Sequence, residues 1–415
     1  MANNGPTPKR GKLRLLVKRV PGTMKRPATM KRPAFKRPAA KITQYTPVSQ
    51  KNSAAFKELR RVAEGATSVS LQAMGKQTDK QFYRALYKSR HLSLRQKCWH
   101  CTGTSLSKLQ LRYAGVMAQR CNSKKCRKWN YPYHGHAVLH SSSGHNSSIR
   151  TQMSILHCAV WGVPQAIVPA LVQNASRKST EEIYHRWQDA LAEFVEAKQA
   201  SMSLEGEDPE NPLQIEADEG AFGLEDPGEK EPGTAVAFNE YVGLMARDQP
   251  DSLYLEKRDP GHCEATRAES GRACPPQYTA QEWVSLRTGA GSSRDKPLMG
   301  ENVLPRTDGS RCYANVDADA NQVHDSVIHS YRGDGPEYVA SRQHELPSSD
   351  ILQAKAETCS MDGWWKWGKQ AVQQVNRTNP AAMNRKIRVQ QWHTWCRGED
   401  RWMKASEVLS ILFRN

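Results

Sequence analysis

Three acidic residues, far apart in the sequence, have surroundings typical of a metal site. Asp218 belongs to segment 213–219, whose alternating apolar and polar residues predict a strand. Asp308 follows a second strand expected at 302–304, and Asp362 opens an aromatic segment. Mg²⁺ and Mn²⁺ prefer carboxylate oxygen, and two such ions about 3.5–4 Å apart stabilise the attacking and leaving oxygens of a phosphoryl transfer. The three acids therefore predict the chemistry of nucleases and DNA transferases.

The third acid has a competitor, Glu357. Five residues of a helix turn about 500°, which leaves Glu357 and Asp362 roughly 140° apart, so one continuous helix cannot direct both at the same metals. Lys366 and Lys369 lie within about 40° of the direction of Asp362 and favour it. In the simpler interpretation, Asp362 caps the helix and the neighbouring tryptophans fill a core.

Four cysteines have the spacing of a zinc ribbon. Cys98 and Cys101 form one close pair, and Cys121 and Cys126 form a second pair after a segment that predicts a hairpin. The wider second pair leaves a degenerate, metal-free ribbon as the alternative. Three histidines could substitute as ligands: His100, His134 and His136. A basic and aromatic rim suited to phosphate contact surrounds the second pair: Lys124, Lys125, Arg127, Lys128 and Trp129.

The net charge of +18 is unevenly distributed. Residues 1–150 carry 32 Lys and Arg against three acids, whereas the remainder of the chain is acidic on balance. Such a field predicts a polyanionic partner: duplex DNA, RNA and an acidic protein all fit the charge, and a solvated basic tail is the simplest alternative. Residues 1–55 repeat Lys-Arg-Pro and predict a disordered basic arm. Its segment Lys25 to Lys41 resembles half of a bipartite nuclear-localisation signal, so we expect a nuclear import receptor as a partner and a nuclear protein.

Other compartments and partners are not favoured by the sequence. It has no apolar run of about 18 residues, so no membrane span is expected. Arg14, Lys18 and Arg19 interrupt the first apolar stretch, which argues against a secretory signal. Ten cysteines are then better explained as metal ligands and reduced thiols than as disulfides.

Helical and strand patterns follow the cysteines in that order. Three helices expected within 150–200 suggest a helix-turn-helix, with a plain helical bundle as the alternative. The start of the third helix is expected at 179–182. An acidic linker at 201–212 precedes the strands, which are interrupted by an insertion at 258–297 around one short helix. Strands are expected at 213–219, 235–238, 240–246, 251–257, 302–304 and 327–330.

The order of these features resembles a known family. The chain contains, in sequence, a zinc ribbon, a helix-turn-helix, Asp218-Glu219 in a strand, Thr307-Asp308-Gly309 followed by Tyr313, His329-Ser330, and an acidic-Gly-x-Trp helix at Asp362. From Cys98 onward this order resembles Merlin-type DDE transposases and their bacterial insertion-sequence relatives. The resemblance implies a ribonuclease-H-like catalytic domain over 213–415, with a mixed five-stranded sheet flanked by helices, preceded by the ribbon over 90–145.

The resemblance also implies residue roles. Asp218, Asp308 and Asp362 match the family's three acids, which bind two Mg²⁺ or Mn²⁺ ions, and Lys369 matches a lysine seven residues after the third acid. The expected activity is cut-and-paste DNA transposition on terminal inverted repeats and target DNA, by a homo-oligomer on DNA. The third acid is Asp where the family generally has Glu, and the shorter side chain matters because such sites tolerate only about 0.5 Å of error. A domesticated, catalytically inactive nuclear DNA-binding or regulatory protein is therefore the alternative.

Overall fold

A computed structural model of the 415-residue chain describes most of the sequence after the basic arm. The described residues are 71, 73–112, 115–140, 147–224, 231–270, 272–289, 297–308, 312–313, 324–327, 340–356, 358–372 and 379–413. All belong to one compact unit, Gln44–Asn415. The predicted arm at 1–55, with its Lys25 to Lys41 segment, lies outside the described residues, as do Glu357 and His329-Ser330.

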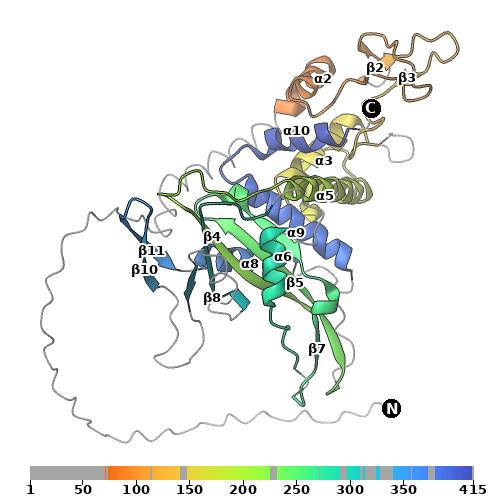
Figure 1. The fold of residues 1–415 in the computed structure, drawn as a ribbon. Coiled ribbons are helices and arrows are strands. Elements are labelled where there is room, and N and C mark those ends of the chain that lie inside the picture. Colours follow the sequence, from red (N-terminus) through yellow and green to blue (C-terminus); the bar gives the residue numbers. More distant parts are fainter. Residues whose placement is uncertain are drawn as a thin grey trace, which may run out of the picture. The chain divides into compact units, whose positions relative to one another are not determined.

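A mixed sheet forms the centre of the acidic half of the chain (Figure 1). The alternation at 213–219 does form a strand, β4, and it extends to Leu224. On one side of β4, β5 pairs antiparallel with β4 and β6 pairs antiparallel with β5, because short connections join these consecutive strands. On its other side β8 and β9 run parallel to β4. The order is β6-β5-β4-β8-β9, with β7 added to β5: β4 Leu213–Leu224, β5 Ala235–Ala246, β6 Tyr254–Lys257, β7 Glu264–Thr266, β8 Val303–Asp308 and β9 Asp325–Val327.

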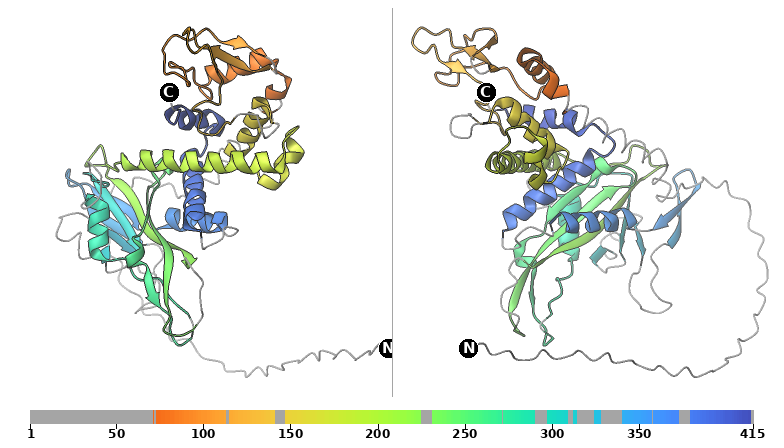
Figure 2. Two further views of the ribbon diagram at one scale, coloured as in Figure 1. Left: turned by 90° about the vertical axis from the view of Figure 1, so that its right-hand side faces the viewer. Right: turned by 180° about the vertical axis from the view of Figure 1, so that it is seen from behind.

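Helices cover both faces of this sheet (Figures 1 and 2). On one face Ile215 and Ala217 of β4 belong to a core with Trp283, in α6 (Ala280–Thr288). On the opposite face Met361 and Trp365 of α8 (Cys359–Val372) join a second core, which includes Tyr241 of β5. The alternation of β4 thus separates an apolar α6 face from a face that presents acids to α8.

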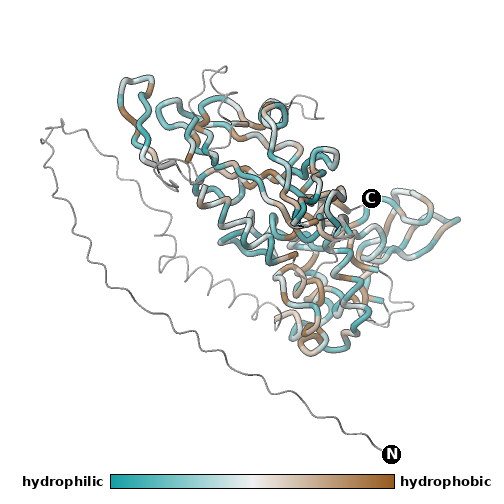
Figure 3. Tube along the Cα trace, turned by 90° about the horizontal axis from the view of Figure 1, so that it is seen from below, coloured by the Kyte–Doolittle hydropathy of each residue, from teal (hydrophilic) through white to brown (hydrophobic). Residues whose placement is uncertain are grey.

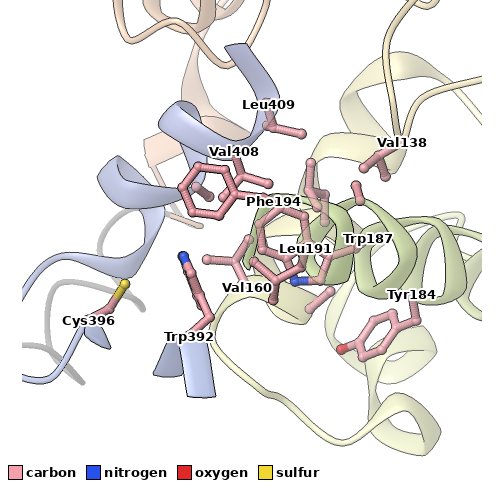
Figure 4. Close-up of a cluster of buried hydrophobic side chains, with 14 of the residues drawn as sticks. Val138, Val160, Tyr184, Trp187, Leu191, Phe194, Trp392, Cys396, Val408 and Leu409 are labelled. Atoms are coloured by element: carbon pink, nitrogen blue, oxygen red, sulfur yellow. The ribbon is translucent and has the colours of Figure 1, made fainter. Parts of the chain in front are cut away.

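Four helices form a layer beside the sheet. The contacts join α3 (Ile149–Val160), α5 (Arg177–Ala200), α9 (Pro380–Trp395) and α10 (Arg401–Ile411). Side chains from all four meet in Figure 4: Val160 from α3, Trp187, Leu191 and Phe194 from α5, Trp392 from α9, and Val408 and Leu409 from α10. The C-terminal helices, which the sequence reasoning did not predict, therefore complete the core of the region proposed as a helix-turn-helix.

The start of α5 differs from the expectation by one turn. Ser176 is the N-cap residue: its hydroxyl accepts from the Ser179 backbone N–H, and the Ser179 hydroxyl accepts from that of Ser176. The expected cap at 179–182 was wrong because the Ser179 side chain already belongs to this first turn. Between α3 and α5 the chain forms only η3 (Gln165–Ile167) and the single-turn α4 (Val168–Leu171).

Smaller elements surround the cysteines and the sheet. The cysteine region has a short three-stranded sheet that follows α2. Of the strand expected at 251–257, only 254–257 is extended, because Pro250 begins a turn of 3₁₀ helix. A hairpin between β9 and α8 was not predicted. The remaining elements are α2 Asp79–Lys88, β1 Gln110–Leu111, β2 Met117–Arg120, β3 Trp129–Asn130, η4 Pro250–Ser252, η5 Pro260–His262, β10 Ala340–Glu345 and β11 Ile351–Ala356.

Hydrophobic and hydrophilic residues are interspersed along the described part of the chain (Figure 3). Among the described helices, none is both long and apolar enough to cross a membrane.

Candidate metal centres

The four predicted cysteine ligands lie together. The sulfur atoms of Cys98 and Cys126 are 3.7 Å apart, as are those of Cys101 and Cys121, and all four lie within 4.8 Å of one another. A tetrahedral Zn²⁺ with Zn–S bonds of about 2.3 Å separates its sulfur ligands by about 3.8 Å. The cluster is therefore compatible with one structural zinc ion.

Each cysteine pair lies on a tight turn. In the first pair the Thr102 N–H donates to the Cys98 carbonyl at 2.8 Å, and in the second the Arg127 N–H donates to the Ser123 carbonyl at 3.1 Å. Thr102 and Arg127 both adopt positive φ, 56° and 48°. The chain therefore reverses after each pair, and the wider spacing of Cys121 and Cys126 does not prevent the sulfurs from converging.

The surroundings of Cys98 lower the pKa of its thiol. Burial raises its pKa, but hydrogen bonds from the His100 and Cys101 backbone and the Asn130 side chain lower it to about 6. Thiolate is the form that binds metal. Of the three alternative histidine ligands, His100 and His134 contact nearby backbone, and His136 Nδ1 accepts from Val138 N–H and Leu139 N–H at 3.0 Å.

A second cluster contains three carboxylates. Asp218, Glu219 and Asp308 each offer an oxygen, and these oxygens lie within 4.8 Å of one another. Asp218 and Asp308 lie on neighbouring strands, because β4 and β8 run parallel with Glu216 opposite Arg306. Two residues further along each strand, Asp218 and Asp308 come side by side. The sequence predicted these two acids and missed Glu219, although it directly follows Asp218.

The three acids disfavour one another's ionised forms. Burial, followed by the charges of Glu219, Asp362 and Asp308, raises the pKa of Asp218 to about 8. Burial also raises the pKa of Glu219 to about 7, despite a hydrogen bond from Tyr313 that opposes the rise. A hard divalent ion has the charge and the oxygen preference to offset this mutual repulsion.

Asp362 lies near this cluster but outside its tightest part. It occupies the first turn of α8, is exposed, and its Oδ2 accepts a hydrogen bond from Thr358 at 3.2 Å. Its charge nevertheless contributes to the raised pKa of Asp218. Lys366 and Lys369 are also exposed on α8.

Two contacts fix α8 against the sheet, and the sequence reasoning missed both. The fully buried Glu216 carboxylate accepts from the Ser360 N–H at 2.7 Å and the Met361 N–H at 3.3 Å, and it pairs with Arg247 at 3.0 Å. Glu216 therefore caps the N-terminus of α8. One turn later the Trp365 indole N–H donates to Asp218 Oδ2 at 2.9 Å.

A third missed contact orders Glu219. The Tyr313 hydroxyl donates to Glu219 Oε1, and the Tyr313 ring is fully buried against Trp283 of α6. The sequence identifies Tyr313 only as the tyrosine that follows Thr307-Asp308-Gly309, not as a partner of Glu219. The alternation of β4 could have indicated that Glu216 shares a face with Asp218, whereas nothing local in the sequence indicates the indole or phenol contacts.

The chain was compared with models of protein families, with curated proteins and with solved structures, and none of these comparisons gave a match.

Proposed function

We propose that this protein is a DNA-cutting and DNA-joining enzyme of the DDE transposase type. The observation that carries the proposal is the cluster of Asp218, Glu219 and Asp308 on two neighbouring parallel strands. Asp362 lies on α8, close enough for its charge to raise the pKa of Asp218. Carboxylates with raised pKa values in such a cluster are typical of functional sites.

The sheet supports a ribonuclease-H-like fold for this domain. In β6-β5-β4-β8-β9, the first three strands in the chain are antiparallel, and two parallel strands are added beside β4. The mixture of antiparallel and parallel strands agrees with the sheet that the resemblance implies, although β7, paired with β5, makes a sixth strand.

The proposed ligands of Mg²⁺ or Mn²⁺ are Asp218, Asp308 and Asp362, with Glu219 as an added candidate. The bound ions would lower the pKa of a nucleophilic water or hydroxyl and stabilise the charge on the transferred phosphate. The protein's own contribution is to hold the acids in place: Tyr313 fixes Glu219, and Trp365 and Glu216 fix the contact of α8 with β4. Lys369 is proposed to contact DNA phosphate beside these acids.

Duplex DNA is the proposed partner. Its binding is supported by exposed basic residues beside the second cysteine pair: Lys124, Lys125, Arg127 and Lys128. The α3–α5 region is proposed to contribute as a helix-turn-helix, and its exposed Arg177 and Lys178 open α5. Terminal inverted repeats and target DNA are the proposed substrates, and a homo-oligomer is the proposed active form.

The test is metal-dependent nicking of DNA that carries the element's terminal repeats. Wild-type protein should nick this DNA with Mn²⁺ and not without a divalent ion, and Asp218→Asn should remove nicking while retaining DNA binding. Asp251→Asn, at an exposed aspartate outside the carboxylate cluster, is the matched control and should keep nicking. Nicking by Asp218→Asn at the wild-type rate would refute the proposed site.

A catalytically inactive DNA-binding or regulatory protein is the second candidate. The position of Asp362 favours it, because this acid hydrogen-bonds Thr358 rather than joining the tight cluster of three. An aspartate is also one methylene shorter than the glutamate usual in the resembled family. DNA binding without Mn²⁺-dependent nicking would support this candidate.

A nuclear location is proposed from residues 25–41. Deleting this segment should move a fluorescent fusion from the nucleus to the cytoplasm, and unchanged nuclear accumulation would contradict the assignment.

A further inference from the structure

The indole of Trp365 makes an unusual contact for a core side chain. It is 4% exposed, and its ring packs edge-on against Phe222 and Trp364. Its one polar atom, Nε1, does not point to solvent or to backbone, but donates to Asp218 Oδ2 at 2.9 Å.

Two glycines make room for this ring. A Cβ atom at Gly220 would lie 2.5 Å from Trp365 ring carbons, and one at Gly243 would lie 3.0 Å from Trp365 Cζ2. Gly243 is opposite Asp218 in the β4–β5 pairing, and Gly220 is two residues beyond Asp218 on the same face. The sheet therefore presents no side chains where the indole lies against it, and any residue larger than glycine at these positions would keep the indole N–H from the carboxylate.

The anchoring of α8 fixes the direction of that N–H. Glu216, on the same face of β4, binds the first turn of the helix through the Ser360 and Met361 N–H groups. The helix is thus held at both Glu216 and Asp218. A buried hydrogen bond to one carboxylate oxygen restricts the terminal torsion of an aspartate, which is otherwise broad.

From this geometry we infer that Trp365 is a positioning residue: its indole N–H holds Asp218 Oδ2 and so fixes the orientation in which the Asp218 carboxylate would bind a divalent cation with the neighbouring acids. The inference rests on the proposed function, since it assigns a metal ligand's partner. It assigns to a core tryptophan a role that packing alone does not require.

The neighbouring tryptophan provides a matched control. Trp364 lies on the same helix, is 6% exposed, and its Nε1 donates to Thr394 Oγ1 at 3.1 Å. Replacing either tryptophan by phenylalanine removes one buried indole hydrogen bond and similar ring volume. Only Trp365→Phe removes a bond to an acid of the carboxylate cluster.

The experiment is a calorimetric titration of the full-length, zinc-loaded protein with Mn²⁺. Trp365→Phe should weaken Mn²⁺ binding about tenfold, the effect typical of losing a hydrogen bond to a metal ligand. Trp364→Phe should bind Mn²⁺ as wild type does, while both variants lose thermal stability. Equal Mn²⁺ affinity in wild type and Trp365→Phe would overturn the inference and leave the proposed function standing.

An NMR titration of the wild-type protein tests the inference even if the Trp365→Phe variant does not fold. With ¹⁵N-labelled tryptophan, Mg²⁺ should shift one of the 11 indole N–H signals much more than the others. Saturation with Mg²⁺ that leaves every indole signal unmoved would overturn the inference. A wild-type protein that binds neither Mn²⁺ nor Mg²⁺ would instead remove the proposed function, and the inference with it.

Discussion

The four-cysteine cluster and the carboxylate cluster are two candidate metal sites built on different principles. The cysteines come from two local turns, and their sulfurs have the spacing of a complete tetrahedron. The carboxylates come from strands and a helix that are distant in sequence, and Asp362 lies outside the closest group. A closed ligand set suits a structural ion, whereas an incomplete one leaves room for substrate. The two sites should therefore respond oppositely to loss of a ligand.

The largest effect is expected at the cysteines. Replacing Cys121 and Cys126 by serine should release about one Zn²⁺ per chain and unfold the local β1–β3 sheet, because a structural zinc site contributes on the order of 10 kcal/mol. Elemental analysis and hydrogen exchange would measure this. Soluble, folded wild-type protein without zinc would end the assignment, whereas Cys274→Ser, at an exposed cysteine outside the cluster, is the control and should retain the metal.

The next largest effect concerns the third acid. Asp362→Ala should reduce Mn²⁺-dependent nicking by at least about 100-fold, or ~3 kcal/mol of transition-state stabilisation, and leave DNA binding intact. Glu357→Ala should not have this effect, and Asp362→Glu should retain or raise activity. Plasmid or terminal-repeat nicking measures all three variants.

Two outcomes of that series would change the interpretation. Nicking by Asp362→Glu but not by wild type would identify a decayed enzyme. Wild-type nicking by Asp362→Ala would show that the third acid is elsewhere.

Low pH should affect the stability of the helical layer and of the carboxylate cluster in opposite directions. Burial lowers the pKa of His91 and His157 to about 4, so between about pH 6.5 and pH 4 the unfolded chain binds protons that the folded chain does not. As the pH falls through this window, each of these histidines should therefore lower the free energy of unfolding by about 3 kcal/mol. Asp218 and Glu219 act in the opposite direction, because their raised pKa values make the folded chain bind protons there. Urea denaturation at several pH values measures the net slope, and His157→Phe should remove the contribution of this histidine. An unchanged slope in His157→Phe would show that other groups cause it.

The smallest effect distinguishes the two sites most directly. Asp308→Asn removes one of several repelling carboxylates and should stabilise the protein by about 1 kcal/mol when no Mn²⁺ or Mg²⁺ is added. The same variant should lose its stabilisation by Mn²⁺. Thermal melting with and without Mn²⁺ tests both parts, and destabilisation of Asp308→Asn without the ion would indicate that the cluster is held by contacts rather than strained by charge.

Local patterns predicted the parts of these sites that depend on local geometry. The spacing of Cys98, Cys101, Cys121 and Cys126 and the alternation around Asp218 both correspond to what the chain forms. Asp308 was recognised beside a strand, although β8 includes it. These features depend on residues a few positions apart, where periodicity is informative.

Contacts between distant segments were not predictable in the same way. Glu216 was seen as a polar residue of a strand, but its role depends on the N-terminus of a helix that begins at Cys359. The β10–β11 hairpin and the packing of α9 and α10 were also missed. The two helices do have local start signals, Asn379-Pro380 and Asp400, but their packing against α3 and α5 is decided by tertiary contacts.

The return of α10 to the start of the described chain has a consequence for biosynthesis. His91 Nε2 lies 2.7 Å from the Trp402 carbonyl, its ring stacks on Trp402, and α10 contacts both α3 and α5. Segments separated by about three hundred residues must therefore meet before this layer is complete. While the ribosome is still producing the sheet, α3 and α5 expose apolar surface that only later residues cover, so the region nearest the cysteines is translated early and reaches its native packing late.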